Sequence, residues 1–186
     1  MPKKEGQIRP YRKWQEVVRE DTKKLHLMDN NILACEYGIE QLSELSQTDY
    51  RIDLNQGMDI MLVNDEICKI IKKIKWDKYI RFSCDKEYQI PFFEKAIELF
   101  DKYEIPKSKI FIYLLVQKDI ENAEKRLRAL YKIYPNFSIY AQAERNSLLG
   151  IEPSKAQLEF AQRYVYGRKF KTEKWSEYKE KRGIEG

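Results

Sequence analysis

Short apolar segments recur along this chain at a nearly constant interval, and each of them ends in polar residues. The first is Lys24-Leu25-His26-Leu27-Met28, and four more follow at residues 50–54, 78–84, 109–116 and 137–141. Their polar ends, near residues 31, 56, 85, 117 and 145, lie 25 to 32 residues apart. One strand–helix unit takes about 30 residues, so this spacing predicts a repeated βα array.

Amphipathic stretches fill the intervals, at residues 36–46, 66–74, about 91–103 and 119–134. Asn64 and Asp65 are suited to cap the second stretch, and Pro91 fits the first turn of the third. Alternating strands and helices favour a parallel sheet with right-handed crossovers. We therefore expect an α/β fold, a partial (β/α) barrel with about five parallel strands. The chain has no glycine-rich phosphate-binding loop, so a nucleotide-loop fold is not indicated.

This pattern divides the chain into three parts. Residues 1–23 are expected to form an N-terminal loop and short helix, residues 24–150 the partial barrel, and residues 151–186 a helical C-terminal tail. A complete eight-stranded barrel takes about 250 residues, so five strands leave open edges. We expect exposed apolar surface near Leu25, Leu27 and Ile32, and a tendency to self-associate.

Composition limits the partners and the compartment. The 186 residues carry 35 Lys and Arg against 30 Asp and Glu, a net charge of +5, which permits an anionic partner without requiring one. No apolar run approaches the ~20 residues of a membrane span, so no membrane partner is expected. Cys35, Cys68 and Cys84 are odd in number and widely spaced, which favours free thiols in a cytoplasmic protein over disulfides or a local metal site.

Polar residues gather where the predicted strands end. The carboxyl ends of parallel strands meet at one edge of a sheet, where ligands bind. Polar loops and helix caps explain any one such residue, but the repetition over several strands favours a site. The expected ring is Asp29, Asn30, Asn31, Asp53, Asn55, Gln56, Arg81, Ser83, Asp85, Gln117, Gln142, Glu144 and Arg145.

Several of these segments resemble radical S-adenosylmethionine proteins, in particular a group of bacterial members often carried by phages or prophages. The resemblance covers most of the chain, with the elements in the family's order. It is carried by residues 3–6 (KKEG), 27–33 (LMDNNIL), 52–59 (IDLNQGMD), 80–85 (IRFSCD), 160–165 (FAQRYV) and 175–179 (WSEYK).

The resemblance implies a partial (β/α)6 barrel that binds S-adenosylmethionine and a [4Fe–4S] cluster to generate a 5′-deoxyadenosyl radical. In the family, a CxxxCxxC loop after the first strand ligates the cluster. That loop is absent here, and Met1–Gly6 is similar to the stretch that follows it in relatives. We therefore expect this chain to carry the second to sixth strands, to hold no cluster, and to be inactive alone unless an upstream polypeptide supplies the loop.

The resemblance also assigns cofactor-binding positions. Asp29, Asn30 and Asn31 match the segment that binds the cofactor's amino group, although the family's GGE is missing. Asn55 ends the third strand of the family. Ser83 and Asp85 lie where the ribose or carboxylate is bound, with Arg81 on the same face, and Gln117 ends the next strand, without the family's adenine-stacking glycine. No catalytic residue, metal ligand or substrate is assigned.

Three other interpretations remain open. His26, the only histidine, is expected to be a core residue, and an Asp53–Glu144 pair could act as in glycosidases, although nothing selects it. The tail from Arg163 to Arg182 has eight basic and three acidic residues with aromatics between them, which is typical of nucleic-acid binding or of a protein-binding module. We favour a tail that packs its aromatic side chains against the barrel.

Overall fold

The chain forms a parallel α/β structure. The computed structural model describes residues 12–19, 21–28, 31–145 and 149–184. Its strands are β1 (Lys24–Leu27), β2 (Arg51–Leu54), β3 (Met58–Asp59), β4 (Lys75–Trp76), β5 (Ile80–Cys84), β6 (Ile110–Val116) and β7 (Ser138–Ala143). Its α-helices are α2 (Glu36–Leu45), α3 (Asp65–Lys73), α4 (Ile90–Lys102), α5 (Ile120–Ile133), α6 (Lys155–Glu159) and α7 (Trp175–Lys181). The π-helix η7 (Phe160–Val165) continues α6.

The strands form two sheets whose order follows the chain. One sheet has the order β1-β2-β4 and the other β3-β5-β6-β7, and every pairing is parallel. The predicted parallel α/β arrangement is confirmed, and β1, β2, β5, β6 and β7 correspond to the five predicted segments. The expected number of strands is wrong, because β3 and β4 have two residues each and are too short to produce a periodic pattern.

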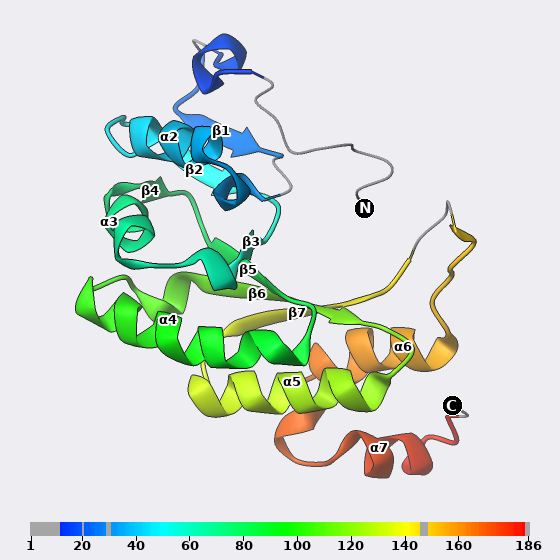
Figure 1. The fold of residues 1–186 in the computed structure, drawn as a ribbon. Coiled ribbons are helices and arrows are strands. Elements are labelled where there is room, and N and C mark those ends of the chain that lie inside the picture. Colours follow the sequence, from blue (N-terminus) through cyan, green and yellow to red (C-terminus); the bar gives the residue numbers. More distant parts are fainter. Residues whose placement is uncertain (1–11, 20, 29–30, 146–148, 185–186) are drawn as a thin grey trace.

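One side of the larger sheet is covered by helices. In β6, Ile110, Ile112, Leu114 and Val116 are buried, whereas Phe111, Tyr113 and Leu115 are half-buried. The buried set joins the same core as Ala123, Leu127 and Leu130 of α5. Helices α4 and α5 lie side by side along this side of the sheet (Figure 1). The alternate residues of each strand therefore form a second face, the open face, which these helices leave uncovered.

Local sequence signals set the starts of three helices, of which the Asn64 cap and the position of Pro91 were predicted. Asn64 Oδ1 accepts a hydrogen bond from the backbone N–H of Ile67 at 3.0 Å and so caps α3. Asp119 Oδ1 caps α5 in the same way, through the N–H of Asn122 at 2.9 Å. Pro91 lies in the first turn of α4, where its missing N–H needs no partner.

The region around β1 is better packed than the sequence suggested. Leu25 and Ile32 are 7% exposed, so the expected apolar surface at these two residues is wrong. The 3-10 turn η2 (Ile32–Ala34) lies directly against α2. A Cβ at Gly38 of α2 would be 2.0 Å from the carbonyl oxygen of Ile32, so this close packing requires glycine. Leu27 remains half-buried.

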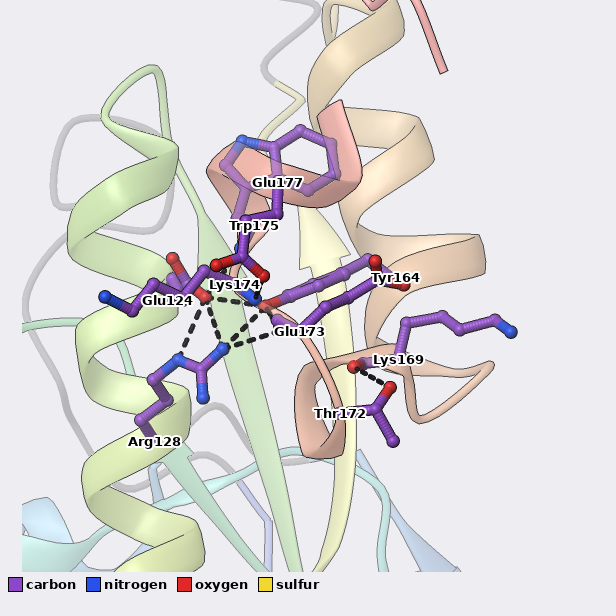
Figure 2. A network of polar contacts seen from close by, with 9 residues as sticks. All are labelled: Glu124, Arg128, Tyr164, Lys169, Thr172, Glu173, Lys174, Trp175 and Glu177. Carbon is purple, nitrogen blue, oxygen red and sulfur yellow. Dashed lines mark hydrogen bonds and ion pairs between the residues drawn. The ribbon is translucent and has the colours of Figure 1, made fainter. Parts of the chain in front are cut away.

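The C-terminal segment packs on α5 through aromatic side chains and one polar network. Tyr164, Phe170, Trp175 and Tyr178 are each 7% exposed or less, which confirms the packing interpretation for four of the tail's five aromatic residues. Glu124 Oε1 accepts hydrogen bonds from Arg128 Nε, the Tyr164 hydroxyl and the Trp175 N–H, at 2.9, 2.6 and 2.8 Å (Figure 2). The tail is thereby fixed to the helix layer.

Candidate functional site

A row of polar side chains runs across three strands, from β1 through β2 to β5. His26 and Asp53 are opposite each other in the β1–β2 pairing, with His26 Nδ1 3.1 Å from Asp53 Oδ2. Asp53 Oδ1 forms an ion pair with Arg81, whose Nη1 also donates to the carbonyl oxygen of Leu54 at 3.0 Å. The expectation of a core histidine is wrong, because strand alternation turns Leu25 inward and leaves the His26 side chain 54% exposed.

Aromatic side chains continue this row across the open face of the larger sheet. The Arg81 guanidinium lies 5.8 Å from the ring centres of both Tyr79 and Phe111. Phe111 contacts Tyr113 and Tyr140 on the neighbouring positions, with ring centres 5.1 and 6.4 Å away. The Tyr113 hydroxyl donates to the backbone carbonyl of Asn55 at 3.0 Å. These contacts join the two sheets on this face.

Polar side chains meet at the carboxyl edge of the larger sheet, and we call them the carboxyl-edge cluster. Its members are Asn31, Asp59, Asp85, Lys86, Gln117 and Glu144. Asn31 Oδ1 accepts from the Asp59 N–H at 3.3 Å. Gln117 accepts from Lys86 Nζ at 2.9 Å and donates to Glu144 at 3.3 Å, so these contacts connect the ends of β5, β6 and β7.

Asp85 is the member of this cluster whose buried charge has the fewest polar contacts. Its backbone N–H donates to Gln89 Oε1 at 2.7 Å, but no hydrogen bond or ion pair from the described residues reaches its half-buried carboxylate. Burial raises the pKa of Asp85, and the nearby charge of Asp59 adds to the increase, against the opposing effects of Arg126 and Lys86. A desolvated carboxylate of this kind favours a cationic ligand.

Arg126 fixes the strand ends that carry the cluster. This α5 residue is 1% exposed, and its guanidinium donates to the carbonyl oxygen of Cys84 and, at 2.7 Å, to that of Leu115. Its Nε donates to Asn122 Oδ1 at 3.0 Å. One buried side chain therefore holds the last residues of β5 and β6 in place.

The thiols do not fit an iron–sulfur cluster. A [4Fe–4S] cluster needs thiolates at close, fixed positions. Cys68 and Cys84 are fully buried, on α3 and β5, and burial raises the pKa of their thiols to about 11 and about 12. Cys35 precedes α2. Within the part of the chain that the structure describes, no three His, Cys, Asp or Glu side chains are grouped to hold a metal ion.

The structure separates the sequence-predicted site residues into two groups. Asn31, Asp85 and Gln117 lie in the carboxyl-edge cluster, while Arg81 and Ser83 lie on the open face of β5. Asn55 follows β2, and its Nδ2 lies 3.4 Å from Met28 Sδ. Asp29 and Asn30 fall outside the described residues.

Three residues of this region were not predicted as site residues. Asp59 belongs to a strand of two residues that leaves no periodic signal. Lys86 directly follows a predicted strand end and could have been included on that ground. Arg126 falls at the helical spacing of Ala123 and Leu130, so a charged residue on the inward side of α5 was the available signal.

Fold and site together define an α/β protein with parallel sheets and a charged carboxyl edge. No family model, curated protein or solved structure matches the chain. Among the described residues, no helix combines the length and the apolar character that crossing a bilayer requires.

Proposed function

We propose that this chain is the wall of a partial (β/α) barrel that binds S-adenosylmethionine at the carboxyl edge of its parallel sheet, as radical S-adenosylmethionine proteins do. The proposal rests on Asp85, a half-buried carboxylate without a hydrogen-bond partner among the described residues. The parallel strands of each sheet, which follow the order of the chain as in a (β/α) barrel, also support it.

The chemistry of the carboxyl-edge cluster suits this ligand. S-adenosylmethionine carries a sulfonium and an ammonium group, which Asp85 and Asp59 would attract, while Lys86 would bind its carboxylate. The Gln117 amide, which accepts from Lys86 and donates to Glu144, keeps a second N–H and a second lone pair for the ribose hydroxyl groups. In radical S-adenosylmethionine proteins, which this chain resembles, the bound cofactor is the source of the adenosyl radical. Since the described thiols do not fit a cluster, the chain's own residues are assigned to binding and orienting the cofactor.

Calorimetric titration of the full chain tests the proposal by comparing S-adenosylmethionine with S-adenosylhomocysteine. The second compound lacks the sulfonium charge, so it should bind more weakly. Asp85→Asn should weaken S-adenosylmethionine binding about tenfold or more, because a charge-assisted contact contributes ~1.5–3 kcal/mol. It should change S-adenosylhomocysteine binding less.

Glu98→Gln is the matched control. Glu98 is an exposed carboxylate on α4, away from the carboxyl edge, and its loss should leave both affinities unchanged. Equal binding of the two compounds, or equal affinity in wild type and Asp85→Asn, would refute the assignment of the cluster as a sulfonium site.

A further inference from the structure

A hollow lined by aromatic side chains lies at the opposite end of the sheet from the carboxyl-edge cluster. It encloses about 520 Å³ between the start of β6 and β7, the end of α5 and the segment after η7. This volume is within the ~300–1,000 Å³ of typical ligand pockets. Phe111 and Gln117 are six residues apart in β6 and just beyond it, so the hollow and the cluster are about 20 Å apart.

The composition of this hollow is unusual for the chain. Seven of its fourteen lining residues are aromatic, two are basic and none is acidic. Aromatic residues make up 13% of the whole sequence. Half of the lining residues therefore carry flat, polarisable rings, and the charged residues among them are all basic.

Two of the aromatic side chains are available for stacking. Tyr166 is 79% exposed and Tyr140 is 48% exposed. Both also line a smaller hollow of about 170 Å³ beside the first, together with Ile139. The two hollows therefore adjoin at Tyr140 and Tyr166, and we call them together the groove.

The cations beside these rings lack acidic partners. In the described part of the chain, no carboxylate forms an ion pair with Arg168 or Lys171. Lys171 Nζ lies 5.0 Å from the ring centre of Tyr131, and Arg168 is exposed. By contrast, Arg163 and Lys181 of the same tail are paired with Glu159 and Glu173.

We propose that this groove binds single-stranded nucleic acid. Tyr140 and Tyr166 stack on successive bases, and Arg168 and Lys171 contact the neighbouring phosphates. Exposed aromatic rings next to unpaired cations are the recognition chemistry of single-stranded nucleic acid, and every base offers a face for stacking. An acidic peptide would use the cations and leave the two tyrosine rings without a function.

Fluorescence anisotropy with labelled oligonucleotides tests this proposal on the full chain. We expect saturable binding of oligodeoxythymidine or oligouridine of ten nucleotides, with an affinity that decreases as the salt concentration increases. Tyr166→Ala and Tyr140→Ala should each weaken binding about fivefold or more, as expected for losing one stacked base. Arg168→Ala should reduce the slope of log K against log salt concentration by about 0.7.

Two exposed residues outside the groove provide controls. Tyr88→Ala removes a tyrosine that is 63% exposed at η4 (Glu87–Gln89), and Lys95→Ala removes an exposed cation on α4. Both should bind oligonucleotides like the wild type. Absence of saturable binding at about 100 μM protein, the weak limit of non-specific binding, would overturn the proposal. Unchanged affinity in Tyr166→Ala and Tyr140→Ala, or equal competition by polyglutamate or duplex DNA, would do the same.

Discussion

Arg126 of α5 donates a hydrogen bond from Nη2 to the carbonyl oxygen of Leu115 in β6, over 2.7 Å. The same guanidinium contacts the carbonyl oxygen of Cys84 in β5. These carbonyl groups lie at the ends of adjacent strands, so their positions depend on one side chain. The carboxyl-edge cluster begins directly after these strands, and its geometry therefore depends on a residue that would not touch the ligand.

Arg126→Lys should destabilise the protein by about 2 kcal/mol or more, because a single ammonium group cannot reproduce the fork that reaches both carbonyl groups. Urea unfolding monitored by circular dichroism measures the change. Lys125→Arg, at the exposed neighbouring position, should stay within about 0.5 kcal/mol of the wild type. Equal stability of Arg126→Lys and wild type would show that the strand ends do not need this clamp.

Asp85→Asn should increase stability at neutral pH while it weakens cofactor binding. Burial raises the native-state pKa of Asp85 above 3.8, so the native state holds this proton more tightly than the unfolded chain does. Wild-type stability therefore falls as pH rises from about 3.8 through the native-state pKa. Asn carries no such charge, so the variant should have the higher urea midpoint at pH 7.

The pH dependence separates this effect from a general change in packing. The difference between Asp85→Asn and wild type should disappear as pH falls below about 3.8, where the carboxyl group is protonated in both states. Urea midpoints at a series of pH values measure it. A stability gain that does not depend on pH would mean that the charge of Asp85 is not its cause.

Gly38→Ala should destabilise the protein although alanine is the better helix former. The new methyl group would be 2.0 Å from the carbonyl oxygen of Ile32, and the resulting displacement of η2 should cost about 1–3 kcal/mol. Helix propensity alone predicts a gain of about 1 kcal/mol. Ser43→Ala, at an exposed position of α2, should show only the small gain. Thermal and urea unfolding show whether Gly38→Ala lowers or raises the free energy of unfolding.

Tyr164→Phe should lower stability by about 1–2 kcal/mol, because Glu124 loses a partly buried hydrogen bond at 2.6 Å. Tyr166→Phe is the matched control, since the Tyr166 side chain is exposed and should tolerate the change within about 0.5 kcal/mol. Urea unfolding of both variants provides the measurement. If both variants lose the same stability, the network of Figure 2 does not fix the tail.

Anaerobic incubation with iron and sulfide should leave this chain without a [4Fe–4S] cluster, because two of its thiols are buried in separate elements. Iron analysis and absorption spectra after desalting measure the outcome. Retention of about four iron atoms per chain with a thiolate-to-iron absorption band would contradict the expectation. The triple Cys→Ser variant distinguishes bound cluster from adsorbed iron.

The elements with strong periodicity could be predicted from the sequence. β6 alternates completely between buried and half-buried residues, and α3 is capped by Asn64 as expected. The strands β3 and β4 could not be predicted, because two residues carry no period.

The candidate site was predictable only in part, for a different reason. Asp85 and Gln117 follow strand ends, and the sequence places such residues at one edge of a parallel sheet. Arg81 is polar by sequence, but its ion pair with Asp53 depends on where β2 lies relative to β5. The groove around Tyr140 and Tyr166 joins residues of β7 with residues after η7, a contact that only the tertiary packing creates.

The hydrogen bond from the Trp175 N–H to Glu124 has a consequence during synthesis of the chain. The two residues are 51 positions apart, so α5 leaves the ribosome well before Trp175 does. Until then, Glu124 has no backbone partner from the tail, and the Tyr131 ring of α5 lacks its contact with Phe170. A nascent chain stalled before residue 175 should consequently expose this helix to chaperones, whereas the released chain should not.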